Sequence, residues 1–290
     1  MKETISIKLF NTLKQGKENL NEDSLFRVKN FIKSQLMSDG SFMNKSGKSD
    51  IYYTAFGWML SYVLGIETDH KKTVLFLKKQ DVQQLDLIHY AAYIRCCMIQ
   101  QLFEGGIMKF LAHSFSSKSI RPLSDFDNVP HNDIQSPYTQ FIWLSLLEDT
   151  RNSVRNRDAM LASLNNYHVS GGGYSNMRDG TMSATNATAA ALSVIGQLNE
   201  YNDTDSLNYM LGIQSDTGGF AATEHSPLPD LLSTATALFL LRCYDRRPNV
   251  SPKNFIEAHW LDNGGFSATL LEETSDVEYT FYGLLALGTI

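Results

Sequence analysis

The chain has 290 residues, of which 43% are hydrophobic and 11% are aromatic, and its formal net charge is −6 at pH 7. These values are typical of a soluble globular protein and exclude the basic stripe with which a general nucleic-acid-binding protein neutralises phosphates. Three cysteines cannot form a disulfide framework, and without a signal peptide or a transmembrane segment of roughly 18 apolar residues, we expect a cytoplasmic protein.

The N-terminal part of the chain contains the first predicted helices. Residues 1–23 are polar with scattered apolar positions, and they predict an arm or an extra helix outside the main domain. Residues 24–36 place apolar side chains at helical spacing. The turn 35–42 contains a glycine suited to a helix stop, and Asp50 then precedes an apolar helix over 51–64.

The same pairing of a mixed helix with an apolar helix continues to the end of the chain. The predicted pairs are 73–79 with 86–102, 106–113 with a helix from Pro137, 155–167 with 184–197, 206–214 with 230–243, and 252–260 with 276–287. A long polar loop, 114–132, interrupts the third pair. Proline at 137 suits a first helical turn, where its missing N–H would have no partner anyway.

A repeated turn marks these pairs. Glycine doublets begin at positions 172, 218 and 264, two steps of 46 residues. An aromatic residue follows each doublet, and fourteen residues later come Thr188, Thr234 and Thr280. A fixed period in this range indicates a repeat architecture.

The second helix of each pair is the more apolar one, which predicts a buried position, whereas the mixed first helices are expected to be half-exposed. Six buried helices inside six outer helices describe an all-α protein, an (α/α)6 toroid. An open solenoid would need polar caps, but the last predicted helix is apolar. We therefore predict one closed domain over residues 24–290.

The turns at 35–42 and 214–220 begin with glutamine and end in Gly-(Gly/Ser)-Phe, before an acidic residue and a threonine. Over residues 24–290 this pattern resembles the prenyltransferase and squalene-cyclase repeat superfamily. The resemblance implies a barrel around an apolar cavity, as in protein prenyltransferase β-subunits and terpene cyclase domains. It also implies an isoprenoid or other long apolar substrate. Eukaryotic protein prenyltransferases work with a partner subunit, and the sequence leaves that question open.

The resemblance does not extend to a zinc site. Protein prenyltransferases hold a catalytic zinc with an Asp-x-Cys pair and a later histidine. Asp230 falls at the aspartate position, but Leu232 replaces the cysteine and Tyr279 replaces the histidine. Leucine cannot bind zinc, and a phenol is a poor substitute for imidazole. We therefore expect no metal and no cofactor.

The diphosphate-binding cations of the family are also reduced. In the turn before Asp230 only His225 can carry a positive charge, and Arg178 lies near a family diphosphate contact. Acidic residues at the predicted starts of inner helices, Asp230 and Asp276 among them, could hold a diphosphate only through Mg²⁺. The alternative is that these carboxylates are helix caps.

A third candidate acid is Asp127. The segment 125–128 resembles, with one substitution, the D-x-D-D motif of class II terpene cyclases, in which the central carboxylic acid protonates an alkene. That role requires a raised pKa. The alternative is a solvated turn in a polar loop.

Aromatic residues are concentrated on the predicted inner helices. Aromatic walls suit a polyisoprenoid, and their faces attract cations, although packing between helices is the alternative for each residue. The candidate substrate-binding residues are Tyr53, Phe56, Tyr90, Trp143, Tyr279 and Tyr282. Two functions remain open: a prenyltransferase-like or terpene-cyclase-like enzyme without zinc, and a non-catalytic isoprenoid carrier or scaffold.

Overall fold

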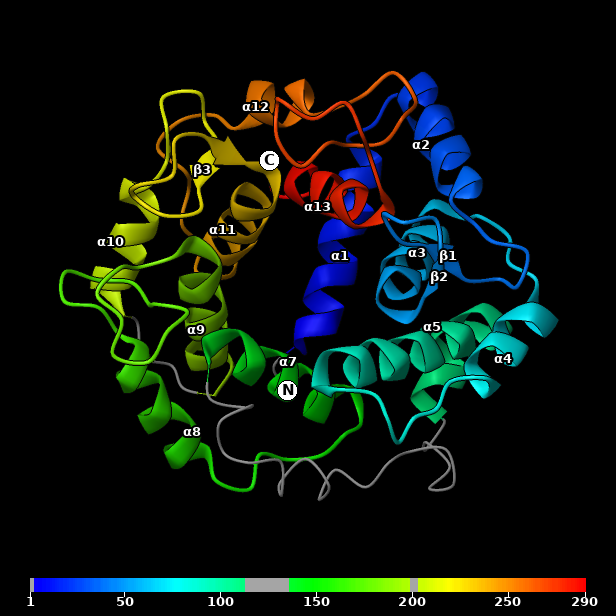
Figure 1. Ribbon diagram of the computed structural model, residues 1–290, viewed down its shortest axis with the longest axis horizontal. Helices are drawn as coiled ribbons and strands as arrows, with labels where there is room; N and C mark the ends of the chain where they lie inside the picture. Colours follow the sequence, from blue (N-terminus) through cyan, green and yellow to red (C-terminus); the bar gives the residue numbers. More distant parts are fainter. Residues whose placement is uncertain (1–2, 113–135, 199–202) are drawn as a thin grey trace.

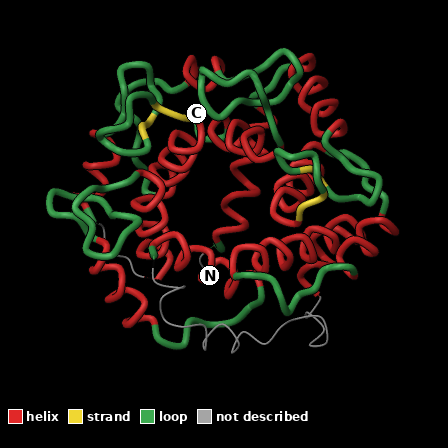
Figure 2. Tube along the Cα trace, in the orientation of Figure 1, coloured by secondary structure: helices red, strands yellow, loops and turns green. Residues whose placement is uncertain are grey.

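The computed structural model describes residues 3–112, 136–198 and 203–290. Within these ranges the chain is mostly helical, and its helices form a closed ring (Figure 1). An inner layer of helices surrounds the ring axis, and shorter helices and turns form the outer layer (Figure 2). The predicted all-α class and the α/α toroid are therefore confirmed.

The inner layer closes on itself. Each inner helix packs against the next one in the sequence, and α13 packs against α3. The inner helices are α3 (Ile51–Leu64), α5 (Leu87–Ala112), α7 (Pro137–Asp149), α9 (Thr185–Leu198), α11 (Leu231–Cys243) and α13 (Val277–Leu287). They are rich in apolar residues because neighbours surround them on most sides. In the described part of the chain, no helix combines the length and the apolar character needed to cross a bilayer.

The outer layer has shorter helices with solvent-exposed polar faces. They are α2 (Glu22–Ser34), α4 (His70–Lys78), α8 (Arg157–Leu164), α10 (Thr204–Gly212) and α12 (Lys253–Ala258), and the 3₁₀ turn η1 (Asn165–Tyr167) follows α8. In α2, acidic Glu22 and Asp23 occupy the first turn and Lys33 the last, which complements the helix dipole.

One predicted boundary is wrong. The sequence predicts a helix that ends near residue 102 and a new one from 106, but α5 continues without a break from Leu87 to Ala112. A glycine inside a helix costs about 1 kcal/mol relative to alanine, which weakens a helix without ending it. Gly105 and Gly106 are thus accommodated inside α5. The predicted loop 114–132 lies outside the described residues.

The repeated threonine has a structural role that explains its spacing. Thr234 Oγ1 accepts a hydrogen bond from the backbone N–H of Phe220 at 2.9 Å, and the threonine is fully buried. The equivalent pairs are Phe42 with Thr54, Tyr174 with Thr188, and Phe266 with Thr280. Because a buried N–H must find a partner, each turn is fastened to the first turn of its own inner helix.

Two short antiparallel hairpins return the chain from the aromatic turn to the start of an inner helix. They are β1 (Phe42–Met43) with β2 (Ser49–Asp50), and β3 (Phe220–Ala221) with β4 (Pro229–Asp230). Each hairpin ends at the aspartate that caps the following helix.

Glycines in the turns allow each repeat to pack closely against the next outer helix. Gly218 has a φ of +91°, and a Cβ there would lie 2.4 Å from the Ser251 oxygen, just before α12. Gly264 has a φ of +89°, and a Cβ there would lie 2.5 Å from the Arg27 oxygen in α2. Only glycine tolerates both the conformation and the contact. The second contact joins the last repeat to the first and closes the outer layer.

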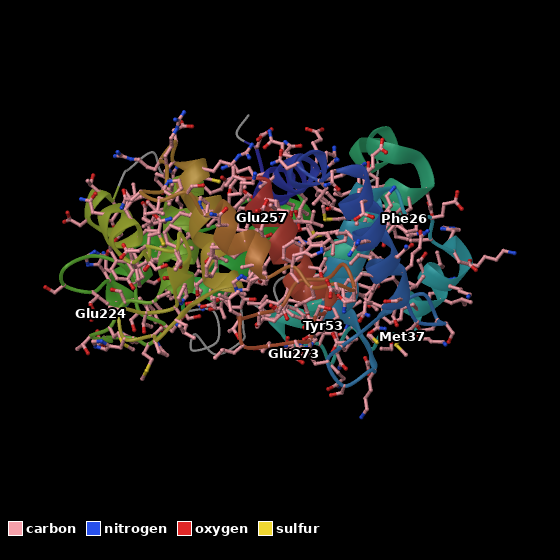
Figure 3. The ribbon with its side chains drawn as sticks, turned by 90° about the horizontal axis from the view of Figure 1, so that it is seen from above. Phe26, Met37, Tyr53, Glu224, Glu257 and Glu273 are labelled. Atoms are coloured by element: carbon pink, nitrogen blue, oxygen red, sulfur yellow. The ribbon has the colours of Figure 1, made fainter. Side chains whose placement is uncertain are left out.

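Helix α1 (Ile5–Glu18) packs across one end of the ring (Figure 1). The Ile5 N–H donates to Glu148 Oε2 at 2.8 Å, near the end of α7, and Asn19 donates to the Leu287 oxygen at 2.7 Å, at the end of α13. The C-terminal ends of the inner helices therefore lie at α1, and we call this the α1 end. Their N-terminal ends form the opposite end, the mouth end, where Figure 3 shows Tyr53 and Glu273.

Candidate functional site

A cavity of about 260 Å³ is lined by side chains from α1 and from every inner helix named above. This volume lies slightly below the range of roughly 300–1,000 Å³ usual for small-molecule sites. Tyr52 and Tyr138, in the first turns of α3 and α7, line it at the mouth end, and Leu9 of α1 lines it at the α1 end. The cavity therefore extends along the ring axis.

Small side chains keep this space open. On α5 and α9 the cavity wall includes adjacent alanines, Ala91 with Ala92 and Ala189 with Ala190. A methyl group fills little of the space that a leucine would occupy, so the interior is not close-packed along the axis. Apolar atoms make up most of the wall, which suits an apolar ligand.

Aromatic rings from α3 and α13 form one side of the cavity. The ring centroids of Tyr52 and Phe56 are 5.0 Å apart, and those of Phe56 and Phe281 are 4.9 Å apart, both with edge-to-face geometry. Tyr282 adjoins Phe281 at 5.6 Å. Tyr52 and Phe56 are four residues apart, so they lie on the same face of α3. Such rings contribute apolar area together with electron-rich faces.

A carboxylate lies behind this aromatic wall at the mouth end. The Tyr52 hydroxyl donates a hydrogen bond to Glu278 Oε1 at 2.9 Å, which also joins α3 to α13 across the ring closure. Burial raises the pKa of the Glu278 carboxyl above its ordinary value, against the opposing effect of its hydrogen bonds. Burial likewise raises the pKa of Tyr52, so the phenol keeps its proton.

Asp276 and Lys45 occupy the rim beside this carboxylate. Asp276 caps α13 by accepting the Tyr279 N–H at 2.8 Å, and burial raises the pKa of its carboxyl. Lys45, on the loop between β1 and β2, lies 3.8 Å from Asp276 Oδ2 and 4.8 Å from the centroid of the Tyr279 ring. A lysine from the first repeat therefore covers the start of the last inner helix.

Arg95 of α5 is the charged residue of the cavity lining. Its Nη2 donates to Ser145 Oγ at 2.6 Å and lies 3.5 Å from Asp149 Oδ2, where α7 ends. The same nitrogen lies 3.5 Å from Ser6 Oγ of α1. The guanidinium group of Arg95 thus points toward the α1 end, where the Asp149 carboxylate offsets its positive charge.

Only some of the predicted substrate-binding aromatic residues line the cavity. Phe56 and Tyr282 line the cavity. Tyr53, Tyr279 and Trp143 do not belong to its lining. The sixth candidate, Tyr90, is fully buried and packs against Tyr93 with ring centroids 6.4 Å apart, which is the packing alternative given for it.

The predicted acids and cations lie apart from the cavity wall. Asp230 caps α11 by accepting the Ser233 N–H at 2.8 Å, as Asp276 caps α13. Arg178 and His225 keep 58% and 76% of their side-chain surface exposed, each beside an acidic neighbour. Asp127 lies outside the described residues.

The positions that would hold zinc do not fit the metal. Leu232 lines the cavity with an apolar side chain, and Lys45 covers the ring of Tyr279. Among the described residues, no three His, Cys, Asp or Glu side chains converge as metal ligands would. The two positions that would complete a zinc site with Asp230 therefore supply neither an imidazole nitrogen nor a thiolate sulfur.

Several residues of the site were not among the predicted set. Tyr52 and Tyr138 lie next to predicted or repeated positions, and only the choice of helix face separates Tyr52 from Tyr53. Arg95 could have been found as a lone charge inside the apolar run of α5. No sequence pattern indicated Lys45, because its contacts with Asp276 and Tyr279 form only when the ring closes.

A closed α/α toroid with an apolar axial cavity defines the structural class of this protein. Its sequence matches the prenyltransferase alpha-alpha toroid domain over residues 4–114 and 124–290, and the chain belongs to that family. The matched region includes α1. No curated protein matches the chain.

Proposed function

We propose that the protein acts on an isoprenoid or another long apolar molecule held in the axial cavity, without catalytic zinc. The observation that carries this proposal is the cavity itself, whose aromatic and aliphatic walls come from α1 and the inner helices together. Family membership supports the same class of ligand. The apolar wall supplies affinity through burial, at about 25 cal/mol per Å² of ligand surface removed from water.

The residues at the zinc-ligand positions support a mechanism without this metal. Leu232 and Tyr279 offer neither thiolate nor imidazole, so the site lacks the means to hold an acceptor thiol as thiolate. Tyr52 and Tyr138 place oxygen groups on the cavity wall at the mouth end, and Glu278 lies behind Tyr52.

Binding can be tested by native mass spectrometry with geraniol, farnesol and geranylgeraniol. We expect one alcohol per chain, and Ala190→Leu is expected to weaken binding at least ~10-fold because it fills the cavity. Ala162→Leu, on the exposed face of α8, is the matched control and leaves binding unchanged. Absence of binding by all three alcohols would contradict the proposal.

A second candidate function is a carrier that binds the same ligands without converting them. It is favoured by the exposure of Arg178 and His225, because neither belongs to the cavity lining where it could hold a diphosphate. Incubation with prenyl diphosphates and with polyenes, followed by mass spectrometry, separates the two functions. New products indicate an enzyme, and recovery of the unchanged ligand indicates a carrier.

A further inference from the structure

Within the part of the chain that the structure describes, Glu278 provides a negative charge at the mouth end that no ion pair offsets. Among the described residues no basic side chain lies within ion-pair distance of its carboxylate, and the Tyr52 hydroxyl donates a hydrogen bond to it at 2.9 Å. The nearby ammonium group of Lys45 is held by Asp276. A half-buried carboxylate with only neutral donors keeps a strong local field.

Tyrosine hydroxyls link the Glu278 carboxylate to the cavity wall. Because the Tyr52 hydroxyl donates a hydrogen bond to Glu278, the lone pairs of the Tyr52 oxygen remain available as acceptors. Tyr52 and Tyr138 both line the cavity. Burial raises the pKa of Tyr282, Glu278 raises it further, and Arg95 opposes this with a smaller effect.

The positive group of the cavity is directed toward the other end and is already paired. Arg95 is bound by Ser145 and by Asp149 at the end of α7. Among the described residues, the cavity thus has a paired cation toward its α1 end and an anion without an ion-pair partner behind its mouth end. The aromatic faces of Phe56 and Phe281 lie on the side of the cavity where this anion lies, and they add their own attraction for cations.

From this arrangement we infer that the mouth end of the cavity selects ligands whose apolar body carries a positive charge, such as an alkyl ammonium or sulfonium, over anions of the same size. The inference rests on the proposed function, since the apolar body occupies the same cavity. The inference goes beyond the proposed function because it assigns the sign of the charge that the site prefers. It also names Glu278, acting through Tyr52, as the residue that sets this preference.

Three probes with the same ten-carbon chain test the charge preference: decyltrimethylammonium, decanol and decanoate, measured by calorimetry below their micelle concentrations. We expect the ammonium to bind at least ~10-fold tighter than decanol, with decanoate the weakest. Tighter binding of decanoate than of the ammonium would overturn the inference. If none of the three binds, the proposed function itself fails, and the inference fails with it.

Variants identify the residue responsible. Glu278→Gln is expected to remove the difference in affinity between the ammonium and decanol. Tyr52→Phe keeps the ring, removes the hydroxyl and should reduce the difference, which provides a second test if Glu278→Gln folds poorly. Glu273→Gln changes the net charge equally on an exposed loop and should keep the full difference. A difference that persists in both Glu278→Gln and Tyr52→Phe would refute the assignment.

Discussion

Replacement of Thr234 by valine removes one hydrogen bond and changes little else. The two side chains have nearly the same shape, so the packing around this fully buried position is kept. The lost partner is the acceptor for the Phe220 N–H, a bond of 2.9 Å inside the turn before α11. Thr234→Val therefore leaves a buried backbone donor without a partner.

An unsatisfied buried donor costs about 1–3 kcal/mol of the free energy of unfolding. For a chain of this size each kcal/mol lowers the Tm by roughly 2–4 °C, so we expect a decrease of about 4–8 °C for a loss near 2 kcal/mol.

Urea unfolding followed by circular dichroism at 222 nm measures this loss, provided that the m-value is unchanged. Thr236→Val is the matched control in the same helix. The Thr236 hydroxyl donates to the Leu232 carbonyl at 2.9 Å, so its removal leaves no donor without a partner. A loss below about 0.5 kcal/mol for Thr234→Val, or an equal loss for the control, would refute the role assigned to the repeated threonine.

Three further predictions concern the α1 contact, pH and metal. Gly16→Ala should destabilise the protein by about 1–3 kcal/mol, because a Cβ there would lie 2.0 Å from the Leu284 oxygen. Gly212→Ala is the control, since a Cβ at Gly212 would meet open space. Equal losses of the free energy of unfolding in urea for the two variants would contradict the close-contact argument. Burial lowers the pKa of His259, so the unfolded chain takes up the proton first and stability falls as the pH drops below about 6.5. His259→Gln should flatten this slope between pH 7.5 and 5.5, and an unchanged slope would exclude His259 as its cause. Elemental analysis of untagged protein should find no stoichiometric zinc, and zinc that disappears in Asp230→Ala would restore a zinc-dependent mechanism.

The helical repeat was predictable because its signal is local. The fourteen-residue spacing between Phe220 and Thr234 reflects a hydrogen bond within one turn and one helix, so the constraint is written in a short stretch of sequence. The continuation of α5 through Gly105 was not predictable, because a glycine pair weakens a helix and ends it only where the surroundings favour a turn. The placement of α1 depends on contacts between Gly16 and α13, which no local pattern encodes.

The site was predictable only in part. Periodicity placed aromatic residues on the inner helices, but adjacent residues in a helix point about 100° apart, so the exact face decides which of them reaches the axis. Tyr52 lines the cavity and Tyr53 does not. Caps such as Asp230 have the same sequence pattern as a catalytic acid at the start of a helix. Only the hydrogen bond to the Ser233 N–H reveals the capping role.

The contact between the two ends of the ring affects how the chain folds during synthesis. Asn19, which follows α1, is hydrogen-bonded to Leu287 at the end of α13 although 268 residues separate them. At a synthesis rate of about 5–20 residues per second, α1 waits roughly 13–54 s on the ribosome before its partner is made. During this interval the apolar faces of α1 and α3 lack α13, and only completion of the last repeat covers them. The early chain is thus exposed to aggregation until this long-range contact forms.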